Sequence, residues 1–311
     1  MELIDRLNEY GKKRKPIFFA IDFEMKEWIL EDENVQFQLG NFRNFKPQKL
    51  HTKAKITNRL HAEFQEYKKA LQKVKEEIKK GNTYLLNLTF ETKLKGDIDL
   101  NSIFHRANAP FKLHVKNRFV CFSPERFVQI KHNQISTYPM KGTIEANIPH
   151  ALERILANPK EMSEHTMVVD LLRNDLGIVG RNVQVEKFRY VDKINAGEKE
   201  LLQVSSKITA DLDTNWHENL GNIIKKMLPA GSITGTPKRK TVEIIKAIEN
   251  YERGFFTGVF GYYDGKSFDS AVMIRFIEKQ KDGYIYKSGG GITYDSDEVS
   301  EYQEMKDKVY I

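Results

Sequence analysis

The stretch Phe111–Lys131, FKLHVKNRFVCFSPERFVQIK, decides the fold class. Apolar and polar residues alternate along it, and it is rich in aromatic and β-branched side chains, as half-buried strands are. A second stretch, Tyr84–Leu94 (YLLNLTFETKL), has the same pattern. Strands with one buried face are typical of antiparallel sheets, so the sequence predicts antiparallel sheet here.

Helical patterns surround these strands. Apolar residues that share one face predict a helix over residues 61–80, and Gly81 closes it. Asn158 and Pro159 resemble the cap and first turn of a helix that runs toward Gly177. Other ranges give helices at 216–228, 238–250 and 297–308, strands at 256–263, 270–276 and 284–287, and mixed short strands and loops over 1–50. Separate blocks of sheet and helix favour an α+β fold.

Composition limits the function classes. The 311 residues, 40% of them hydrophobic, can bury a large core, and neither a repeat nor a flexible linker divides them. We therefore expect one catalytic domain over residues 1–311. No apolar run reaches membrane-spanning length, no export signal is visible, and Cys121 has no partner cysteine, which favours a cytoplasmic protein. The net charge of +7 is scattered, as on a solvated surface, rather than clustered for nucleic acid.

Two stretches combine reactive residues with unusual surroundings. In Pro139–Thr143 (PMKGT), Lys141 stands between a proline and a glycine, although a single lysine is usually a solvated one. Glu164 lies on the apolar side of the helix that Asn158 begins. A carboxylate on a buried face needs a cation or a proton, which makes a hard metal plausible.

Two further stretches are rich in glycine. The segment 228–238, LPAGSITGTPK, can offer backbone N–H groups to an anion or form an ordinary turn, and it is not a P-loop. Gly289–Gly291 allow close approach of the backbone to a ligand, and the helix after them carries Glu304 and Lys308 on one face. The plainer alternative for that helix is a surface ion pair.

Together and in this order, the four stretches resemble the chorismate-utilising family, which includes anthranilate, isochorismate, salicylate and aminodeoxychorismate synthases. The resemblance runs from about Tyr84 to the C-terminus, whereas residues 1–60 match poorly and look shortened. It implies the family fold, a large sandwich of two facing antiparallel sheets flanked by helices. It also implies that Glu164 and Glu304 hold Mg²⁺, a metal that prefers carboxylate, substrate and water oxygens.

The same resemblance assigns roles in substrate binding and catalysis. Thr143 is expected to hydrogen-bond near the ring carboxylate, and Glu125 is expected to protonate the departing C4 hydroxyl as a general acid. Cationic side chains and backbone N–H groups are expected to bind the substrate carboxylates: Arg275, Lys308, Gly289 and Gly291.

Lys141 points to the amine-adding branch of the family, in which this lysine attacks C2 of chorismate as a covalent nucleophile. The expected product is 4-amino-4-deoxychorismate, an intermediate on the route to p-aminobenzoate and folate. Ammonia is then expected from a separate glutamine amidotransferase subunit, and pyruvate removal from a separate lyase. The chain itself shows no amidotransferase triad.

At three positions the sequence departs from the family pattern, and each departure bears on the assignment to the amine-adding branch. Leu85 replaces the lysine of the water-adding members and the glutamine of many amine-adding ones, so what positions ammonia is open. Gln203 replaces a common histidine that anthranilate synthases use, and Phe256 replaces a common tyrosine. The alternatives left are an anthranilate synthase large subunit, which Lys141 and Gln203 disfavour, and a non-catalytic chorismate-binding protein.

Overall fold

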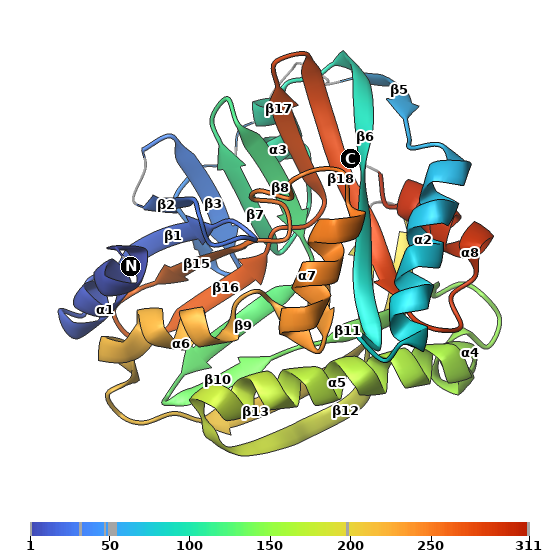
Figure 1. The fold of residues 1–311 in the computed structure, drawn as a ribbon. Helices are drawn as coiled ribbons and strands as arrows, with labels where there is room; N and C mark the ends of the chain where they lie inside the picture. The colour runs from blue at the N-terminus through green and yellow to red at the C-terminus, as the bar shows by residue number, and fades with distance from the viewer. Residues whose placement is uncertain (1, 31–32, 47, 49–54, 197–198, 310–311) are drawn as a thin grey trace. The chain divides into compact units, whose positions relative to one another are not determined.

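The computed structural model of the chain describes residues 2–30, 33–46, 48, 55–196 and 199–309 (Figure 1). These residues form two antiparallel sheets and eight α-helices, so the expected α+β class is confirmed. The helices are α1 (Glu2–Lys12), α2 (Phe64–Lys79), α3 (Leu100–Arg106), α4 (Ala151–Ala157), α5 (Pro159–Val179), α6 (Leu220–Met227), α7 (Lys238–Ile248) and α8 (Glu298–Asp307).

Each sheet has nine strands. The first follows the order β11-β13-β10-β9-β16-β15-β1-β2, and β12 also pairs with β13; the second follows β14-β6-β18-β17-β8-β7-β3-β4, and β5 also pairs with β6. The strands of the first sheet are β1 (Ile17–Ile21), β2 (Trp28–Leu30), β9 (Arg126–Lys131), β10 (Gln134–Thr137), β11 (Met140–Glu145), β12 (Arg181–Ala196), β13 (Lys199–Asp211), β15 (Val259–Tyr263) and β16 (Phe268–Val272). Those of the second are β3 (Val35–Leu39), β4 (Phe42–Arg43), β5 (Lys55–Leu60), β6 (Leu85–Asp97), β7 (Phe111–Val115), β8 (Phe119–Ser123), β14 (Gly235–Thr236), β17 (Phe276–Gln280) and β18 (Gly283–Ile292).

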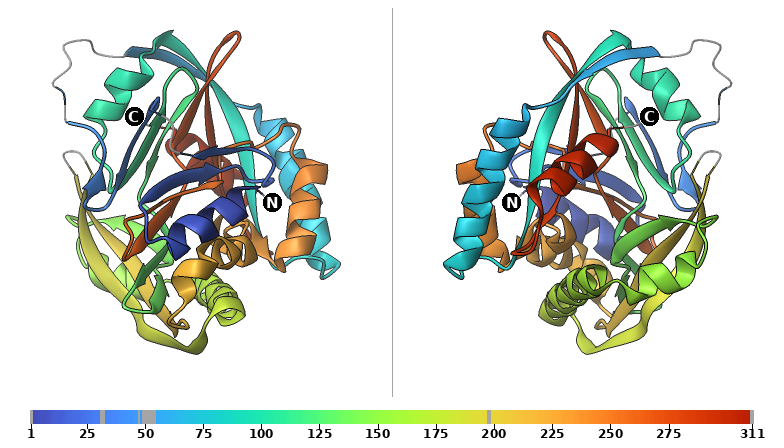
Figure 2. Two further views of the ribbon diagram at one scale, coloured as in Figure 1. Left: turned by 90° about the vertical axis from the view of Figure 1, so that its left-hand side faces the viewer. Right: turned by 90° about the vertical axis from the view of Figure 1, so that its right-hand side faces the viewer.

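The chain forms two compact units. Unit 1 comprises Met1–Phe18, Glu125–Ser232 and Gly261–Ser270; unit 2 comprises Phe19–Pro124, Ile233–Phe260 and Ala271–Ile311. In unit 1, α5 packs along β11, β12 and β13, and α1 lies beside α6 (Figure 2). In unit 2, helices α2, α7 and α8 pack near β6 and β18, and α3 packs against β7 and β8.

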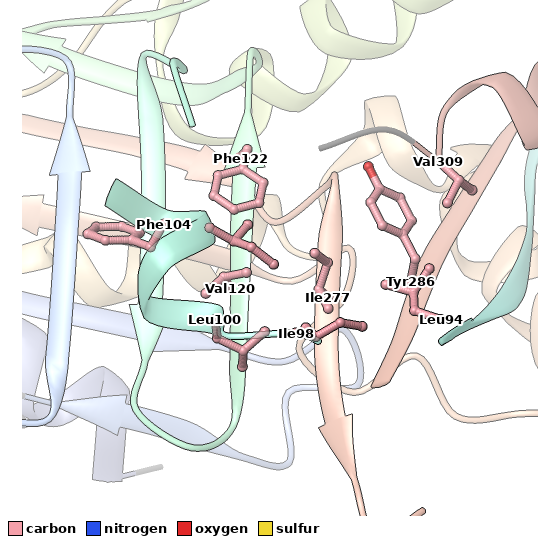
Figure 3. Packing of buried hydrophobic residues seen from close by; sticks show 10 residues of the cluster. Leu94, Ile98, Leu100, Phe104, Val120, Phe122, Ile277, Tyr286 and Val309 are labelled. Carbon is pink, nitrogen blue, oxygen red and sulfur yellow. The ribbon is translucent and has the colours of Figure 1, made fainter. Parts of the chain in front are cut away.

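A hydrophobic cluster in unit 2 holds α3 against its sheet (Figure 3). Phe104 of α3, Val120 of β8, Ile277 of β17 and Tyr286 of β18 have no exposed surface in it. Burying a side chain of this size contributes about 1.5–3 kcal/mol. The expectation of half-buried strands is wrong for β7 and β8, in which every residue is buried, because α3 and the hydrophobic cluster also cover their second face.

Most of the expected elements are found close to their predicted bounds, but the single strand expected over 270–276 is wrong, because β16 ends at Val272 and β17 begins at Phe276. The helix expected over 61–80 is α2, and Gly81 follows it with φ +74° and donates its N–H to Ile78 O. Asn158 caps α5 by accepting a hydrogen bond from Glu161 N, as its position predicts. Among the described residues, no helix is long and apolar enough to cross a membrane.

The prediction for the N-terminus is wrong over Glu2–Lys12, where the chain forms α1 rather than strands and loops. Leu3, Leu7 and Gly11 recur every four residues and are buried on one face. A Cβ at Gly11 would lie 1.8 Å from His217 O, so glycine permits the close packing of this helix. The expectation of a single catalytic domain over residues 1–311 stays a prediction.

Candidate functional site

Lys141 lies in a β-bulge of unit 1. Strand β11 pairs with β13 at Met140↔Ser205 and at Thr143↔Gln203, so β11 carries one extra residue between these pairs. Gly142 takes φ +88° there, a conformation that glycine adopts readily. A Cβ at Gly142 would lie 3.2 Å from Glu161 Oε2, so the space beside it is also limited. The Pro-x-x-Gly-Thr segment is therefore a bulge and not only a strand end.

The side chains of Lys141 and Glu164 form an ion pair. Lys141 Nζ lies 2.9 Å from Glu164 Oε2, and their side chains are 26% and 9% exposed. Glu164 is thus buried on α5 and balanced by a cation, as its place on the apolar side predicts. The pair brings together the residues expected to act as nucleophile and as metal ligand.

His165 follows Glu164 and is fully buried. Its Nε2 lies 2.6 Å from Ser206 Oγ, and Ser206 Oγ also accepts a hydrogen bond from Arg189 N. Burial, with the nearby charges of Arg189 and Lys141, lowers the pKa of His165 to about 4. The imidazole is therefore neutral at pH 7 and ties α5 to β13 rather than acting as an acid.

Thr143 already has a hydrogen-bond partner within the protein. Its Oγ1 donates to Gln203 Oε1 at 2.8 Å, while Gln203 Nε2 donates to Gly142 O at 2.8 Å. A hydroxyl has a single proton to donate. Donation from Thr143 to a substrate carboxylate therefore requires that its bond to Gln203 breaks.

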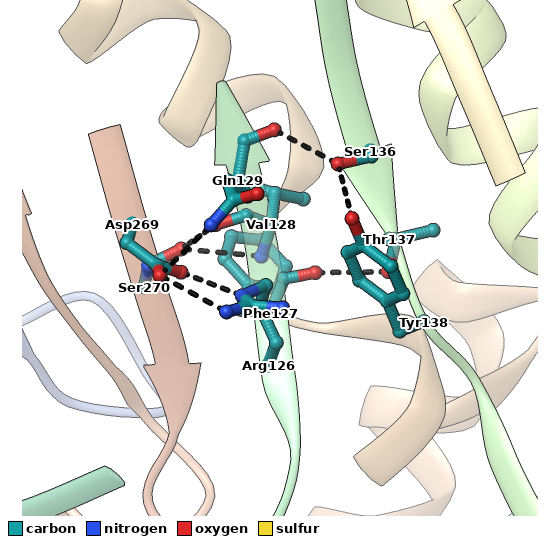
Figure 4. A network of polar contacts seen from close by, with 9 residues as sticks. All are labelled: Arg126, Phe127, Val128, Gln129, Ser136, Thr137, Tyr138, Asp269 and Ser270. Carbon is teal, nitrogen blue, oxygen red and sulfur yellow. Dashed lines mark hydrogen bonds and ion pairs between the residues drawn. The ribbon is translucent and has the colours of Figure 1, made fainter. Parts of the chain in front are cut away.

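Glu125 occupies the turn between β8 and β9 and is half-buried. The next residue, Arg126, is fixed in unit 1 by two bonds to Asp269, from Nε at 2.7 Å and from Nη2 at 3.1 Å (Figure 4). Gln129 Nε2 reaches the same carboxylate at 3.1 Å. This network holds the start of β9 and with it the backbone that carries Glu125.

The three glycines of unit 2 lie inside a strand rather than in a loop. Gly289 pairs with Thr89 of β6, and Gly291 pairs with Asn87. A Cβ at Gly289 would lie 2.1 Å from Leu88 O, so close packing of β18 on β6 requires glycine. Strand β18 pairs with β17 only as far as Lys287. Beyond Lys287, β18 pairs with β6 on one edge, and no described strand pairs with its other edge. Backbone groups on its other edge can face a ligand.

Helix α8 places charged side chains over this strand. Lys308 Nζ lies 2.6 Å from Glu304 Oε1 and donates to Gly289 O at 2.8 Å. A Cβ at Gly290 would lie 3.5 Å from Glu304 Oε1 and 3.6 Å from Lys308 Nζ. A Cβ at Gly290 would therefore make only ordinary van der Waals contact with these two groups. Lys308, Glu304 and Gly289 lie together in unit 2.

Arg275 stands at the bend between β16 and β17 of unit 2 with φ +53°, which is rare for a residue with a side chain. Its carbonyl accepts a hydrogen bond from Phe122 N. Other non-glycine residues, such as Arg14 and Arg189, also have positive φ, so the binding role of Arg275 stays a prediction.

A buried ion pair in unit 2 contacts β6, the strand that pairs with Gly289–Gly291 of β18 (the glycine strand). Arg253 and Glu249 have side chains that are each 1% exposed, with Arg253 Nη2 2.7 Å from Glu249 Oε1. Arg253 also donates to Asn87 O at 2.6 Å, and Glu249 accepts from Thr89 N at 2.9 Å. Because Asn87 and Thr89 pair with the glycine strand, this pair holds the surface against which Gly289 and Gly291 lie.

The sequence missed two contributors to these arrangements. Glu161, in the first turn of α5, has its carboxylate beside Gly142 at the bulge. Its spacing of three residues from Glu164 on one helix was a usable signal. The Arg253–Glu249 pair also went unnoticed, although a spacing of four residues with opposite charge marks it.

The segment 228–238 has a structural role in unit 2, to which its residues from Ile233 onward belong. Gly235 and Thr236 form β14, which pairs with Leu86 and Leu85 of β6. Leu85 and Phe256, two of the three departures from the family pattern, are each 3% exposed and are apolar residues of the unit 2 interior.

The donor chemistry suits a hard divalent cation. Glu164 and Glu304 each present a carboxylate that a lysine ammonium already balances. No three His, Cys, Asp or Glu side chains gather into a metal cluster within the residues that the structure describes. Mg²⁺ is commonly held by one or two carboxylates together with substrate oxygens and water, so the residues present fit it.

The chain belongs to the chorismate-binding enzyme family, whose model matches residues 17–311. It is similar to an uncharacterized PabA-like protein from Haemophilus influenzae, with 44% identity covering 99% of this chain and 95% of that protein. It is also similar to aminodeoxychorismate synthase component 1 from Klebsiella aerogenes, with 34% identity covering 79% of this chain and 56% of that protein.

Other similarities are less specific. Anthranilate synthase component 1 from Haloferax volcanii is 31% identical, covering 79% of this chain and 49% of that protein. Among solved structures, MenF, the menaquinone-specific isochorismate synthase from Escherichia coli, matches with a TM-score of 0.75 and 16% identity, covering 99% of this chain and 79% of that one. This match confirms the fold of chorismate-utilising enzymes.

Proposed function

We propose that the protein converts chorismate and ammonia into 4-amino-4-deoxychorismate and water, as a cytoplasmic enzyme of p-aminobenzoate and folate biosynthesis. The observation that carries the proposal is the position of Lys141. Lys141 stands in a glycine-containing bulge, and its Nζ lies 2.9 Å from the carboxylate of the buried Glu164. A lysine that was only solvated at the surface would need neither the bulge nor this partner. Similarity to aminodeoxychorismate synthase component 1 supports the same activity.

The reaction balances through the chain's own side chains. The neutral amine of Lys141 forms a bond to C2 of the ring, the ring double bonds shift, and the C4–O bond breaks. Glu125 gives the proton with which the C4 hydroxyl leaves as water. Ammonia then adds at C4 and gives its extra proton back to Glu125, the double bonds shift back, and the lysine leaves C2 as the neutral amine. Arg275 and Lys308 bind substrate carboxylates, with the backbone N–H groups of the glycine strand.

Glu164 and Glu304 would hold Mg²⁺. The metal would supply positive charge to a bound carboxylate of chorismate. Each glutamate would then exchange its present lysine partner, Lys141 or Lys308, for the metal. An ion pair uses the ammonium form of lysine, whereas attack on C2 uses the neutral amine, so this exchange also suits the nucleophilic role of Lys141.

Ammonia would come from a glutamine amidotransferase subunit, and pyruvate removal would belong to a separate lyase. The name component 1, which the aminodeoxychorismate synthase relatives carry, supports a second component. The competing function is that of an anthranilate synthase large subunit. Lys141 at the bulge and Gln203 in place of histidine speak against it.

The assay is incubation of the purified chain with chorismate, Mg²⁺ and ammonium, followed by identification of the product by mass. We expect 4-amino-4-deoxychorismate, which added aminodeoxychorismate lyase converts into p-aminobenzoate. Omitting ammonium is the control and should stop product formation. Fluorescent anthranilate or isochorismate as the main product would overturn the proposal.

A further inference from the structure

Gln203 has no role in the reaction described above, yet it makes three hydrogen bonds at the bulge of β11. It lies on β13 opposite Thr143 and is 8% exposed. Its Nε2 donates to Gly142 O at 2.8 Å and to Val204 O at 3.3 Å, and its Oε1 accepts from Thr143 Oγ1 at 2.8 Å.

The two carbonyls fix the orientation of this amide. Backbone carbonyl oxygens only accept hydrogen bonds, so the NH₂ group of Gln203 must face Gly142 and Val204. Its oxygen must then face Thr143, which donates. Turning the amide over would set an oxygen against two carbonyl oxygens and leave buried donors without acceptors.

A bulge interrupts the ladder of backbone hydrogen bonds, so the residues in it need other partners. Gln203 is such a partner for the two residues after Lys141. Its amide donates to the carbonyl of Gly142 and accepts from the hydroxyl of Thr143. The backbone direction at Gly142 sets where the Lys141 side chain can point. That side chain meets Glu164 Oε2 at 2.9 Å.

We propose that Gln203 is the positioning residue of Lys141, because its amide fastens the bulge from which the lysine reaches Glu164. The inference rests on the proposed function, in which Lys141 is the nucleophile. Gln203 touches Gly142, Val204 and Thr143, and it acts on the reaction through Lys141.

Two substitutions separate the bonds of Gln203. Gln203→Leu fills similar space and removes all three. Gln203→Glu keeps an acceptor for Thr143 and removes the donor to Gly142 O. Both are expected to misplace Lys141, because both lose the bond to the bulge backbone. Gln36→Leu is the matched control, since it removes one side-chain bond, to His114 Nδ1 at 3.2 Å, from a strand of unit 2.

The first readout needs no chorismate. A water-soluble carbodiimide joins a lysine amine and a carboxylate in direct contact, forming an amide with net loss of one water. In the wild type and in Gln36→Leu, peptide mapping should find the Lys141–Glu164 cross-link. Its yield should fall severalfold in Gln203→Leu and Gln203→Glu at temperatures where all four proteins are folded.

The second readout is turnover of chorismate with Mg²⁺ and ammonium. Misplacing a reacting group by about 1 Å can cost roughly 100-fold, so kcat should fall about 10- to 100-fold with little change in the KM for chorismate. A purely structural role would lower thermal stability and leave the kcat of the folded fraction unchanged.

The outcomes are distinguishable. Absence of the cross-link in the wild type, or an unchanged yield in both Gln203 variants, overturns the positioning role. A wild type that forms the cross-link and does not aminate chorismate overturns the proposed function, while the cross-link yields still decide whether Gln203 places Lys141.

Discussion

At the scale of single residues, each expected metal ligand is paired with a lysine. Glu164 is 9% exposed in its side chain and meets Lys141, whereas Glu304 is 53% exposed and meets Lys308. Removing one partner of a buried pair leaves an uncompensated charge, so Glu164 depends on a cation more strongly than Glu304 does. The two glutamates are therefore not equivalent.

Glu164→Gln and Glu304→Gln are each predicted to lower turnover by at least roughly tenfold and to weaken its dependence on Mg²⁺, since each removes a charged oxygen ligand. The measurement is the initial rate of chorismate consumption over a Mg²⁺ titration. Glu153→Gln is the control, because this glutamate is 72% exposed and pairs with His150 on α4. Wild-type Mg²⁺ dependence in both variants would remove the two glutamates from the metal site.

At the scale of elements, the buried pair of Arg253 and Glu249 links α7 and the segment after it to β6. It contacts β6 at Asn87 and Thr89, directly opposite Gly291 and Gly289 of β18. A buried pair contributes little net stability against an apolar pair, yet loss of one partner is costly. The pair thus acts chiefly by holding Asn87 and Thr89 of β6, which pair with β18.

Arg253→Met is predicted to destabilise the fold by about 3–5 kcal/mol, because it leaves Glu249 buried without its cation. Arg118→Met is the control, since Arg118 and Glu27 are 44% and 57% exposed and such pairs contribute about 0–1 kcal/mol. Urea denaturation of both variants measures the difference. Equal effects of the two substitutions would refute the importance of burial for this pair.

Elements that depend on local chemistry could be predicted from the sequence. The start of α5 follows from Asn158 and Pro159, and the existence of β7 follows from its aromatic and β-branched residues, although its burial on both faces does not. Features that depend on distant partners could not. The bulge at Lys141 depends on pairing with β13 about sixty residues later, and Gly289 lies in a strand because β6 approaches it closely. Helix α1 was missed because only three inward residues mark it.

The candidate site shows the same division. Lys141, Glu164 and Lys308 were singled out through the resemblance to the chorismate-utilising family, and their roles stay predictions. Their partners could not be predicted, since each pairing depends on folding. Gln203 stood out only as a departure from the family pattern, and its three bonds explain what the residue does in this chain.

At the scale of the whole molecule, the family match covers residues 17–311. The aminodeoxychorismate synthase relative from Klebsiella aerogenes is longer, and this chain matches 56% of it. The residues before α2 form α1 and β1–β5 within the described ranges.

The most direct test of the central claim is the intact mass of the enzyme after mixing with chorismate and Mg²⁺ in the absence of ammonium. If Lys141 is the nucleophile, the protein gains the mass of chorismate minus water, and peptide mapping places the gain on Lys141. Adding ammonium should discharge this adduct into 4-amino-4-deoxychorismate, and Lys141→Ala should form none. An enzyme that aminates chorismate without any adduct, and as fast after Lys141→Ala, would contradict the account.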